Sequence, residues 1–256
     1  MQVIPVASSS DGNCTLVKSQ QATILIDCGI SMKALVSSVG LDTVQNLDAI
    51  FVTHEHSDHI RGVGPLGRKY TDLPIFINKL SYQCRGSDFY NIKRFELIEG
   101  KPIRVANLNV TPFNVEHDSA NTFGFFVDET HGNNLCLMLD TGKVNDASKE
   151  FMQEADILII ESNYDERGLM EYPGYSPSHK ARIRRVHLEN RQSFAAIDKV
   201  GVDSFKEIYL GHISPRTNNP ELVSSQFKES FPDYKGEVCT APQWCSYALE
   251  RYSYLR

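Results

Sequence analysis

The sequence is short of several features that would assign a protein to a specialised class. It has no apolar run near the ~20 residues that a membrane span requires, and residues 1–6 lack the basic start and apolar stretch of a secretory signal. It also contains no repeat of fixed period and no segment of low complexity. These absences argue against membrane, secreted and fibrous proteins, and they predict a cytoplasmic protein with no membrane partner.

Paired cysteines and an excess of positive charge are absent as well. The six cysteines, at positions 14, 28, 84, 136, 239 and 245, form no C-x-x-C motif. In a chain of this size they predict reduced thiols rather than a disulfide scaffold. Asp plus Glu is 32 against 26 for Lys plus Arg, a formal net charge of −6. This balance argues against a generally basic surface for nucleic acid and leaves a local basic patch open.

What the sequence does contain is the profile of a globular protein with a substantial core. Its 256 residues are 41% hydrophobic and 23% charged. Short β-branched apolar runs are mixed with helical periodicity, which predicts a layered α/β or α+β domain. The expected strands are at residues 3–7, 23–27, 49–53, 74–77, 103–115, 122–128, 135–139, 157–160, 206–210, 237–240 and 246–252. The expected helices are at residues 32–39, 59–70, 145–154, 179–188, 193–201 and 220–230.

Two connecting segments have a recognisable composition. Residues 131–134, His-Gly-Asn-Asn, predict the turn of a hairpin, because Gly and Asn accept a positive φ. Residues 165–180 are rich in Pro, Gly, Tyr and Ser, which predicts a long surface loop within one domain.

The strongest chemical signal is a cluster of metal-ligand residue types directly after the apolar run at 49–53. His54, His56, Asp58 and His59 lie within six residues. In an extended stretch, side chains at alternate positions share a face, so the first three converge and His59 faces a neighbouring centre. Three imidazoles and a carboxylate suit Zn²⁺ or Mn²⁺ far better than Ca²⁺ or Mg²⁺. A polar loop of unrelated histidines would rarely place four such groups so close together.

Charged or imidazole side chains also end apolar strands elsewhere along the chain. Asp27, His117, Asp140 and His212 each follow such a run. A charged group at a strand end is ordinarily only a strand terminus, so each position alone is weak evidence. Because the carboxyl ends of strands tend to carry the sites of α/β proteins, the four positions together predict a shared site.

In order and spacing, these residues resemble the metallo-β-lactamase superfamily, whose H-x-H-x-D-H element is highly specific. The resemblance spans nearly the whole chain and implies one hydrolase domain over residues 1–256, of α/β class (α+β in some schemes). It also implies a four-layer αβ/βα sandwich with a two-metal site between the sheets. The roles that it implies are one metal on His54, His56 and His117, a second on Asp58, His59 and His212, Asp140 as the bridge, and Asp27 as a support for the histidines.

Two positions indicate the branch of this superfamily. Asp140 stands where lactam-cleaving members with this loop commonly carry Cys, and His56 stands where the diiron flavoproteins carry Glu. Both fit the phosphodiesterase, nuclease and thioesterase branches. Four short segments further resemble the YycJ/WalJ-like bacterial family, which is described as containing DNA exonucleases. These segments are residues 8–14, 161–165, 210–214 and 218–222. One departure is at residues 186–190, which read Val-His-Leu-Glu-Asn where members usually have Gly-His-Leu-Ser-Asn.

His187 and the basic run around it are candidates for contact with substrate. His187 lies roughly where the related tRNA 3′-processing nucleases carry a catalytic histidine outside the metal shell, and such an imidazole would protonate a leaving oxygen. Residues 180–191 hold five basic side chains and one acidic one. A surface histidine on a solvated helix face explains both features equally well. The expected substrate contacts are Ser10, Asn13, Lys180, Arg184 and Ser214.

These observations predict a hydrolase that holds two divalent ions, Zn²⁺ or Mn²⁺, with Fe²⁺ also accepted. The first hypothesis is a phosphodiesterase, a DNA exonuclease in which a metal-bridging hydroxide attacks phosphorus in line. In it, Asp58 or Asp140 steers the proton of that hydroxide and His187 assists the leaving oxygen. The second hypothesis is hydrolysis of a small ester, thioester or cyclic phosphodiester. The third is a non-catalytic, metal-stabilised interaction module, which would be expected to have lost ligands that this chain retains.

Overall fold

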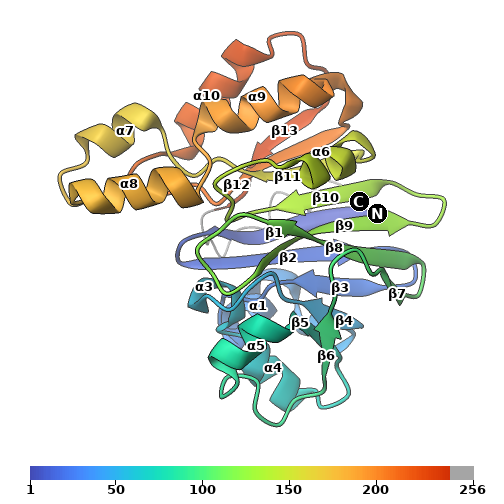
Figure 1. The fold of residues 1–256 in the computed structure, drawn as a ribbon. Coiled ribbons are helices and arrows are strands. Elements are labelled where there is room, and N and C mark those ends of the chain that lie inside the picture. The colour runs from blue at the N-terminus through green and yellow to red at the C-terminus, as the bar shows by residue number, and fades with distance from the viewer. Residues whose placement is uncertain (243–256) are drawn as a thin grey trace.

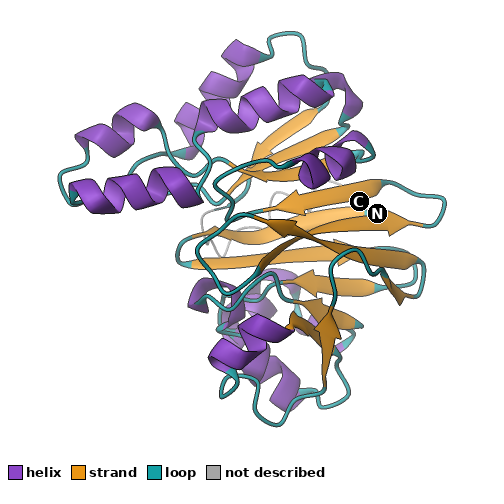
Figure 2. Ribbon diagram, viewed as in Figure 1, coloured by secondary structure: helices purple, strands orange, loops and turns teal. Residues whose placement is uncertain are grey.

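The computed structural model describes residues 1–242. Two β-sheets lie face to face, and helices cover the outer side of each sheet (Figure 1). Figure 2 shows the two helical layers above and below the paired sheets. The α/β class and the four-layer αβ/βα sandwich expected from the sequence are therefore confirmed. No helix in the described range is long and apolar enough to cross a membrane.

The first sheet has six strands, and they neighbour one another in chain order. They are β1 (Gln2–Ser9), β2 (Gly12–Lys18), β3 (Thr23–Ile26), β4 (Ala49–Phe51), β5 (Ile75–Asn78) and β6 (Arg94–Leu97). The pairs β1–β2 and β2–β3 are antiparallel, and the remaining pairs are parallel. Five helices belong to this half of the chain: α1 (Met32–Val39), α2 (Leu41–Gln45), α3 (Ser57–Ile60), α4 (Val63–Lys69) and α5 (Lys79–Arg85).

The second sheet has seven strands in the order β13-β12-β11-β10-β9-β8-β7. They are β7 (Ile103–Val105), β8 (Leu108–Val115), β9 (Thr122–Glu129), β10 (Asn134–Met138), β11 (Ile157–Glu161), β12 (Glu207–Gly211) and β13 (Glu237–Thr240). The strands from β10 to β13 run parallel. The helices of this half are α6 (Asp146–Gln153), α7 (Glu166–Glu171), α8 (Pro177–Val186), α9 (Asn190–Val200) and α10 (Pro220–Ser230), with a 3₁₀ turn at Val202–Ser204. In Figure 1, α7 and α8 project from the body, whereas α6, α9 and α10 cover the sheet.

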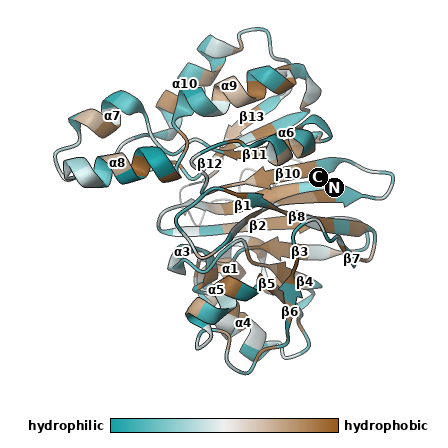
Figure 3. Ribbon diagram, viewed as in Figure 1, coloured by the Kyte–Doolittle hydropathy of each residue, from teal (hydrophilic) through white to brown (hydrophobic). Residues whose placement is uncertain are grey.

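Apolar side chains fill the space between the sheets and the space under each helical layer. The inter-sheet core includes Ile24, Phe51, Phe125 and Ile159, and Phe51 meets Phe125 edge to face with ring centroids 5.8 Å apart. One further cluster lies under the helices of the first half, and another lies under the helices of the second half. Figure 3 shows the apolar colour gathered on the strands. Burial on both faces explains why the strands are continuous apolar runs in the sequence.

The sequence predicted most of these elements, and the structure corrects three of them. The expected helix at 59–70 is divided into α3 and α4 at Gly62, whose backbone N–H donates to Cys28 O at 2.7 Å. A Cβ at Gly62 would lie 2.3 Å from Ile30 O, so this close approach requires glycine. The expected strand at 103–115 is the hairpin of β7 and β8, which turns at Ala106 with φ 53°.

The third correction concerns the expected loop at residues 165–180, which contains α7 and the first turn of α8. The Asp165 side chain accepts from Gly168 N, and the Ser176 side chain accepts from His179 N, so each helix has an N-cap. The turn at His131 is confirmed, with φ 63° between β9 and β10. The sequence analysis missed β2, α2, α5 and β6, and the strand expected at 246–252 lies outside the described residues.

Candidate metal centre

The expected metal-site residues meet at one end of the sandwich, although they come from both sheets. Each follows the end of a strand: Asp27 follows β3, the segment from His54 to His59 follows β4, His117 follows β8, Asp140 follows β10 and His212 follows β12. Phe123 N, at the start of β9, donates to Thr53 O at 3.1 Å and so joins the two sheets at this end. The strand order therefore gathers residues that are up to 185 positions apart, since Asp27 and His212 share this end.

Three of these residues have a backbone conformation that L-amino acids rarely adopt. Asp27, Asp140 and His212 have φ values of 59°, 53° and 51°. All three are buried. Positive φ in a residue with a side chain is strained and persists only where its surroundings hold it. Here the strained turn redirects the side chain at a strand end into the shared site.

The first group of ligand atoms belongs to His54, His56 and His117, whose side-chain donors lie within 4.8 Å of one another. His54 Nε2 is 3.0 Å from His56 Nδ1. In His54 and in His117, the Nδ1 atom has a partner of its own. His54 Nδ1 contacts Thr53 Oγ1 at 2.9 Å, and His117 Nδ1 donates to Val186 O at 3.0 Å. This arrangement fixes the ring and leaves the second nitrogen for a metal.

The second group includes His59, Asp58, Asp140 and His212. His59 Nδ1 donates to Asp27 Oδ2 at 2.7 Å, and its Nε2 is 2.5 Å from Asp140 Oδ2. His212 Nδ1 is 2.8 Å from Asp140 Oδ1. Its Nε2 is buried without a hydrogen-bond partner among residues 1–242, and the nearest oxygen of Asp58 is 3.9 Å away. An unpartnered buried nitrogen facing a carboxylate at that distance fits a bound cation, and the donor set as a whole fits a divalent metal site.

The electrostatics of the centre reflect the same crowding. Burial lowers the pKa of His54 well below its usual range, and the neighbouring His59 lowers it further. Burial would also lower the pKa of His212, but the carboxylates of Asp140 and Glu161 outweigh it and raise that pKa to about 10. Burial alone would raise the pKa of Asp140, but His212 and His59 hold it well below its usual range. Without a cation, the protonated imidazoles supply the positive charge that the carboxylates need.

Glu161 is in contact with this centre, although the sequence analysis did not single it out as a site residue. It ends β11, is fully buried, and its Oε1 lies 2.6 Å from His187 Nδ1 and 2.8 Å from His212 Nδ1. Its other oxygen accepts from Thr141 N at 2.9 Å. The ring of His187 lies beside the cluster, 5.2 Å from that of His117 and 5.3 Å from that of His212. The signal that could have found Glu161 is its place at the end of an apolar strand, the same signal that identified Asp27, Asp140 and His212.

Glu55 is a second buried acid that the sequence analysis passed over. Its Oε1 accepts from Ala120 N at 2.7 Å, and its Oε2 accepts from Ser81 Oγ at 2.5 Å. Glu55 thereby ties the histidine segment to α5 and to the loop that follows His117. The identity of these partners depends on tertiary contacts, so nothing in the local sequence indicates them.

The five expected substrate contacts are only partly brought to this centre. Asn13 is buried, and its Nδ2 lies 3.3 Å from Asp58 Oδ2 and 3.0 Å from His59 Nε2. Ser10 is exposed in the β1–β2 turn, and Ser214 is buried two residues after His212.

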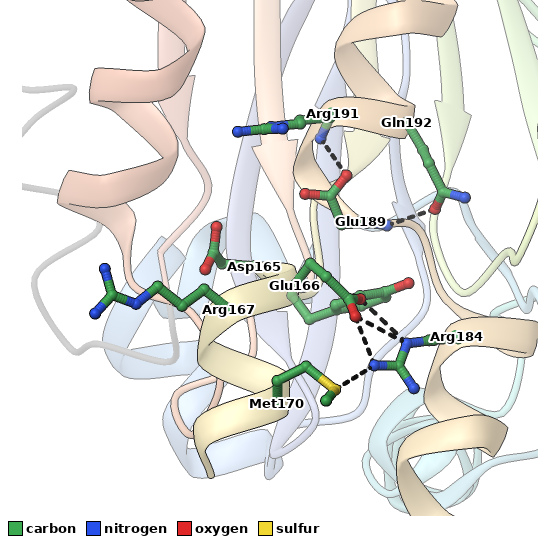
Figure 4. Close-up of a pocket in the computed structure, with 9 residues that line it drawn as sticks. Asp165, Glu166, Arg167, Met170, Arg184, Glu189, Arg191 and Gln192 are labelled. Atoms are coloured by element: carbon green, nitrogen blue, oxygen red, sulfur yellow. Dashed lines mark hydrogen bonds and ion pairs between the residues drawn. The ribbon is translucent and has the colours of Figure 1, made fainter.

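The two basic candidates lie on α8 and donate toward α7. Lys180 Nζ donates to Met170 O at 2.6 Å. Arg184 forms an ion pair with Glu166 at 2.5 Å. Figure 4 shows Arg184 turned toward Glu166 and Met170, on the wall of a cavity of about 620 Å³. The cavity is lined by as many acidic as arginine side chains, so it carries no net charge of either sign.

Comparison with known proteins shows which families the chain resembles. Residues 22–213 match the model of the Beta-lactamase superfamily domain. The chain is 34% identical over 226 residues to "Exodeoxyribonuclease YycJ" of Bacillus anthracis, covering 85% of this chain and 84% of that protein. It is 32% identical over 231 residues to "Exodeoxyribonuclease WalJ" of Streptococcus pneumoniae, covering 85% and 83%.

Solved structures agree with the fold. The metallo-β-lactamase fold protein YhfI from Bacillus subtilis superposes with a TM-score of 0.73 at 19% identity, covering 94% of this chain and 96% of that one. The short form of human tRNase Z superposes with a TM-score of 0.67 at 18% identity, covering 96% and 98%. At this level of identity the likeness concerns the fold.

Proposed function

This chain belongs to the metallo-β-lactamase superfamily and, within it, to the YycJ/WalJ-like family, and from that premise we propose that it is a metal-dependent DNA exonuclease. The observation that carries the proposal is the complete donor set at one end of the sandwich, from His54 to His212, with the His187–Glu161 pair beside it. The relatives named exodeoxyribonuclease cover most of this chain and supply the substrate class.

The proposed centre holds two divalent ions, Zn²⁺ or Mn²⁺. One set of ligands is His54, His56 and His117, and the other is Asp58, His59 and His212, with Asp140 between the sets. When bound, the two ions supply an activated water and neutralise charge on the scissile phosphate. Asp27 orients His59 through the hydrogen bond to its Nδ1, which leaves Nε2 as the ligand atom.

His187 is the proposed general acid. Its Nδ1 is bonded to Glu161, so its Nε2 is the nitrogen that faces substrate. A buried carboxylate on the first nitrogen fixes the orientation of the ring, and the proton then passes from Nε2 to the departing sugar oxygen. Glu161 touches no reacting atom in this scheme and acts as a positioning residue.

A cytoplasmic location is part of the same proposal. Cys14 and Cys28 are free thiols, and the two side chains lie within hydrogen-bond reach of each other. The proposal predicts that these neighbouring thiols stay reduced, as is typical of a reducing compartment.

Hydrolysis assays test the proposal. Duplex DNA and single-stranded DNA, each labelled at one 5′ end, and bis(p-nitrophenyl) phosphate are incubated with Mn²⁺ or Zn²⁺, and Asp140→Ala serves as the inactive control. Stepwise loss of DNA ends that disappears in the control is the expected result, and the label gives the polarity. Cleavage of the small diester with DNA left intact would overturn the exonuclease proposal and favour hydrolysis of a small substrate.

A further inference from the structure

The projecting helices α7 and α8 are attached at both sides of the candidate metal centre. Arg182, in the middle of α8, forms a two-point ion pair with Asp118, next to His117, at 2.5 and 2.9 Å. At the other side, Tyr175 Oη accepts from Arg216 Nη1 at 3.3 Å, on the segment that follows His212. Residues 165–187, which we call the arm, therefore border the site rather than hang free of it. Figure 1 shows the arm at the side of the sandwich where α3 lies.

Three rings gather where the arm turns from α7 to α8, and we call Tyr172, Tyr175 and His179 the ring stack. The rings of Tyr175 and His179 lie nearly parallel, 4.3 Å apart with an interplanar angle of 11°. Tyr172 meets Tyr175 edge to face at 4.7 Å. His179 is exposed and both tyrosines are half-buried. Of the three, only Tyr175 packs against a buried apolar cluster, that of Leu169 and its neighbours, so core packing does not account for the other two.

The charged side chains of α8 are all basic. Residues 177–186 contain Lys180, Arg182, Arg184 and Arg185 and no acidic residue. Two of these arginines are neutralised by Asp118 and Glu166. Lys180 donates only to a carbonyl, and Arg185 is exposed, so both keep their charge available. In a chain of net charge −6, this is a local departure from the overall balance.

We propose that the ring stack, at the outer end of the arm that borders the metal centre, is a platform on which unpaired bases of the DNA strand stack while that strand is held for cleavage. Aromatic rings beside cations on a border of the catalytic site match the chemistry of a single strand, whose bases expose their faces and whose phosphates are anionic. Paired bases are already stacked within a duplex, so the platform favours ends that carry unpaired nucleotides. This inference rests on the proposed nuclease function and identifies where its substrate lies.

Binding of a strand that resists cleavage tests the platform. The probe is a short single-stranded oligonucleotide with phosphorothioate linkages and a 2-aminopurine near each end, added to the full-length protein with Mn²⁺. Stacking on a ring quenches 2-aminopurine, so the wild-type protein is expected to quench its fluorescence. The double variant Tyr172→Ala/His179→Ala is expected to lose that quenching and to bind roughly tenfold more weakly.

The matched control is Tyr90→Ala/His131→Ala, which removes one tyrosine and one histidine that are exposed elsewhere on the chain. It is expected to bind like the wild type. Tyr172→Phe is expected to keep both affinity and quenching, since it retains the ring. A thermal melt of each variant separates loss of fold from loss of binding.

The outcomes separate this inference from the function on which it rests. If the wild-type protein degrades DNA while the Tyr172/His179 variant binds and quenches as the wild type does, the platform is wrong and the nuclease assignment stands. If the wild-type protein neither degrades nor binds DNA, both fail. Equal weakening in the control double variant would also overturn the platform, because the effect would then be unrelated to the arm.

Discussion

At the metal-site end of the sandwich, the polar groups that follow the strands are buried and bonded to one another, whereas at the opposite end they lie in exposed turns. Both ends contain residues of positive φ. At the metal-site end these are Asp140 and His212, which are buried, and at the opposite end it is His131, which is exposed in a hairpin turn. The opposite end also has a cavity, of about 820 Å³, lined largely by polar side chains.

The two ends differ in the hydrogen-bond partners of their charged groups rather than in the types of residue. At the metal-site end, Glu161 alone contacts two histidines and a backbone amide. At the opposite end, Glu129 pairs with the terminal amine of Met1 and accepts from Asn107 in a partly exposed setting. A strand-end charge indicates function when burial forces it to find partners among other strand ends, because an unpaired buried charge is too costly to persist.

The largest contrast between the two ends is expected from removing one carboxylate at each. Asp140→Ala removes the residue shared by both proposed ligand sets, so DNA hydrolysis is expected to fall by about 10⁴-fold. Asp128→Ala, near the end of β9, is expected to keep activity within about twofold, as surface changes usually do. Initial rates on labelled DNA measure both, and comparable losses in the two variants would contradict the assignment of the site.

The next contrast uses one histidine from each end. His187→Ala is expected to lower DNA hydrolysis by about 10³-fold through loss of the general acid, whereas His131→Ala is expected to have no effect. Bis(p-nitrophenyl) phosphate releases an anion that needs no proton, so its hydrolysis by His187→Ala is expected to be far less reduced. Equal losses on both substrates, or loss of bound metal measured by elemental analysis, would argue for a structural or ligand role instead.

Protonation distinguishes the metal-site end further. In the metal-free chain the pKa of His212 is raised to about 10 and that of His59 is also raised, so both are charged at neutral pH. A metal binds neutral imidazole, so its binding near pH 7 is expected to release about two protons and its affinity to rise about 10²-fold per pH unit. Calorimetry in buffers of different ionisation enthalpy measures this release, and a binding enthalpy independent of the buffer would refute it.

Whereas metal affinity is expected to rise with pH, the stability of the metal-free protein is expected to fall. A histidine whose folded pKa is raised contributes stability that is fully present below its unfolded pKa of about 6.5, and that is lost as the pH rises through the folded value. The melting temperature without metal is therefore expected to fall between pH 6.5 and about 10 as the pairs of His212 with Asp140 and Glu161 weaken. A melting temperature that instead rises across this range would show that these pairs do not stabilise the metal-free fold.

The smallest contrast concerns a positioning residue. Glu55→Ala removes the ties to Ala120 N and Ser81 Oγ and is expected to weaken metal affinity by about tenfold, as loss of a group that orients ligands commonly does. Glu154→Ala, an exposed acid at the end of α6, is the matched control and is expected to leave affinity unchanged. Competition with a chromophoric chelator measures both. If Glu55→Gln regains less than half of the metal affinity that Glu55→Ala loses, the charge of Glu55 rather than its hydrogen bonding is the important property.

Local pattern was sufficient for much of the fold. The strands of the inter-sheet core are buried on both faces, so they are continuous apolar runs that can be recognised one at a time. Elements with weaker patterns were missed: β6, with three exposed residues of four, and the short helix α7 within a Pro- and Gly-rich segment. The helix expected at 59–70 is interrupted because Gly62 meets the backbone of residues 28–30, a contact invisible in the local sequence.

Residue type and spacing were enough to predict a divalent-metal site, because the candidate ligands from His54 to His59 are adjacent in the chain. The further groups that contact this site follow from the fold. Glu161 meets His187 and His212 because β11 and β12 are neighbours in the sheet, and Ser8 Oγ accepts from His212 N across 204 positions. The fold also decided which cations of α8 are neutralised, since Asp118 and Glu166 reach Arg182 and Arg184 from distant segments. Spacing governs contacts within one loop, whereas contacts between strand ends depend on the order of the strands in the sheets.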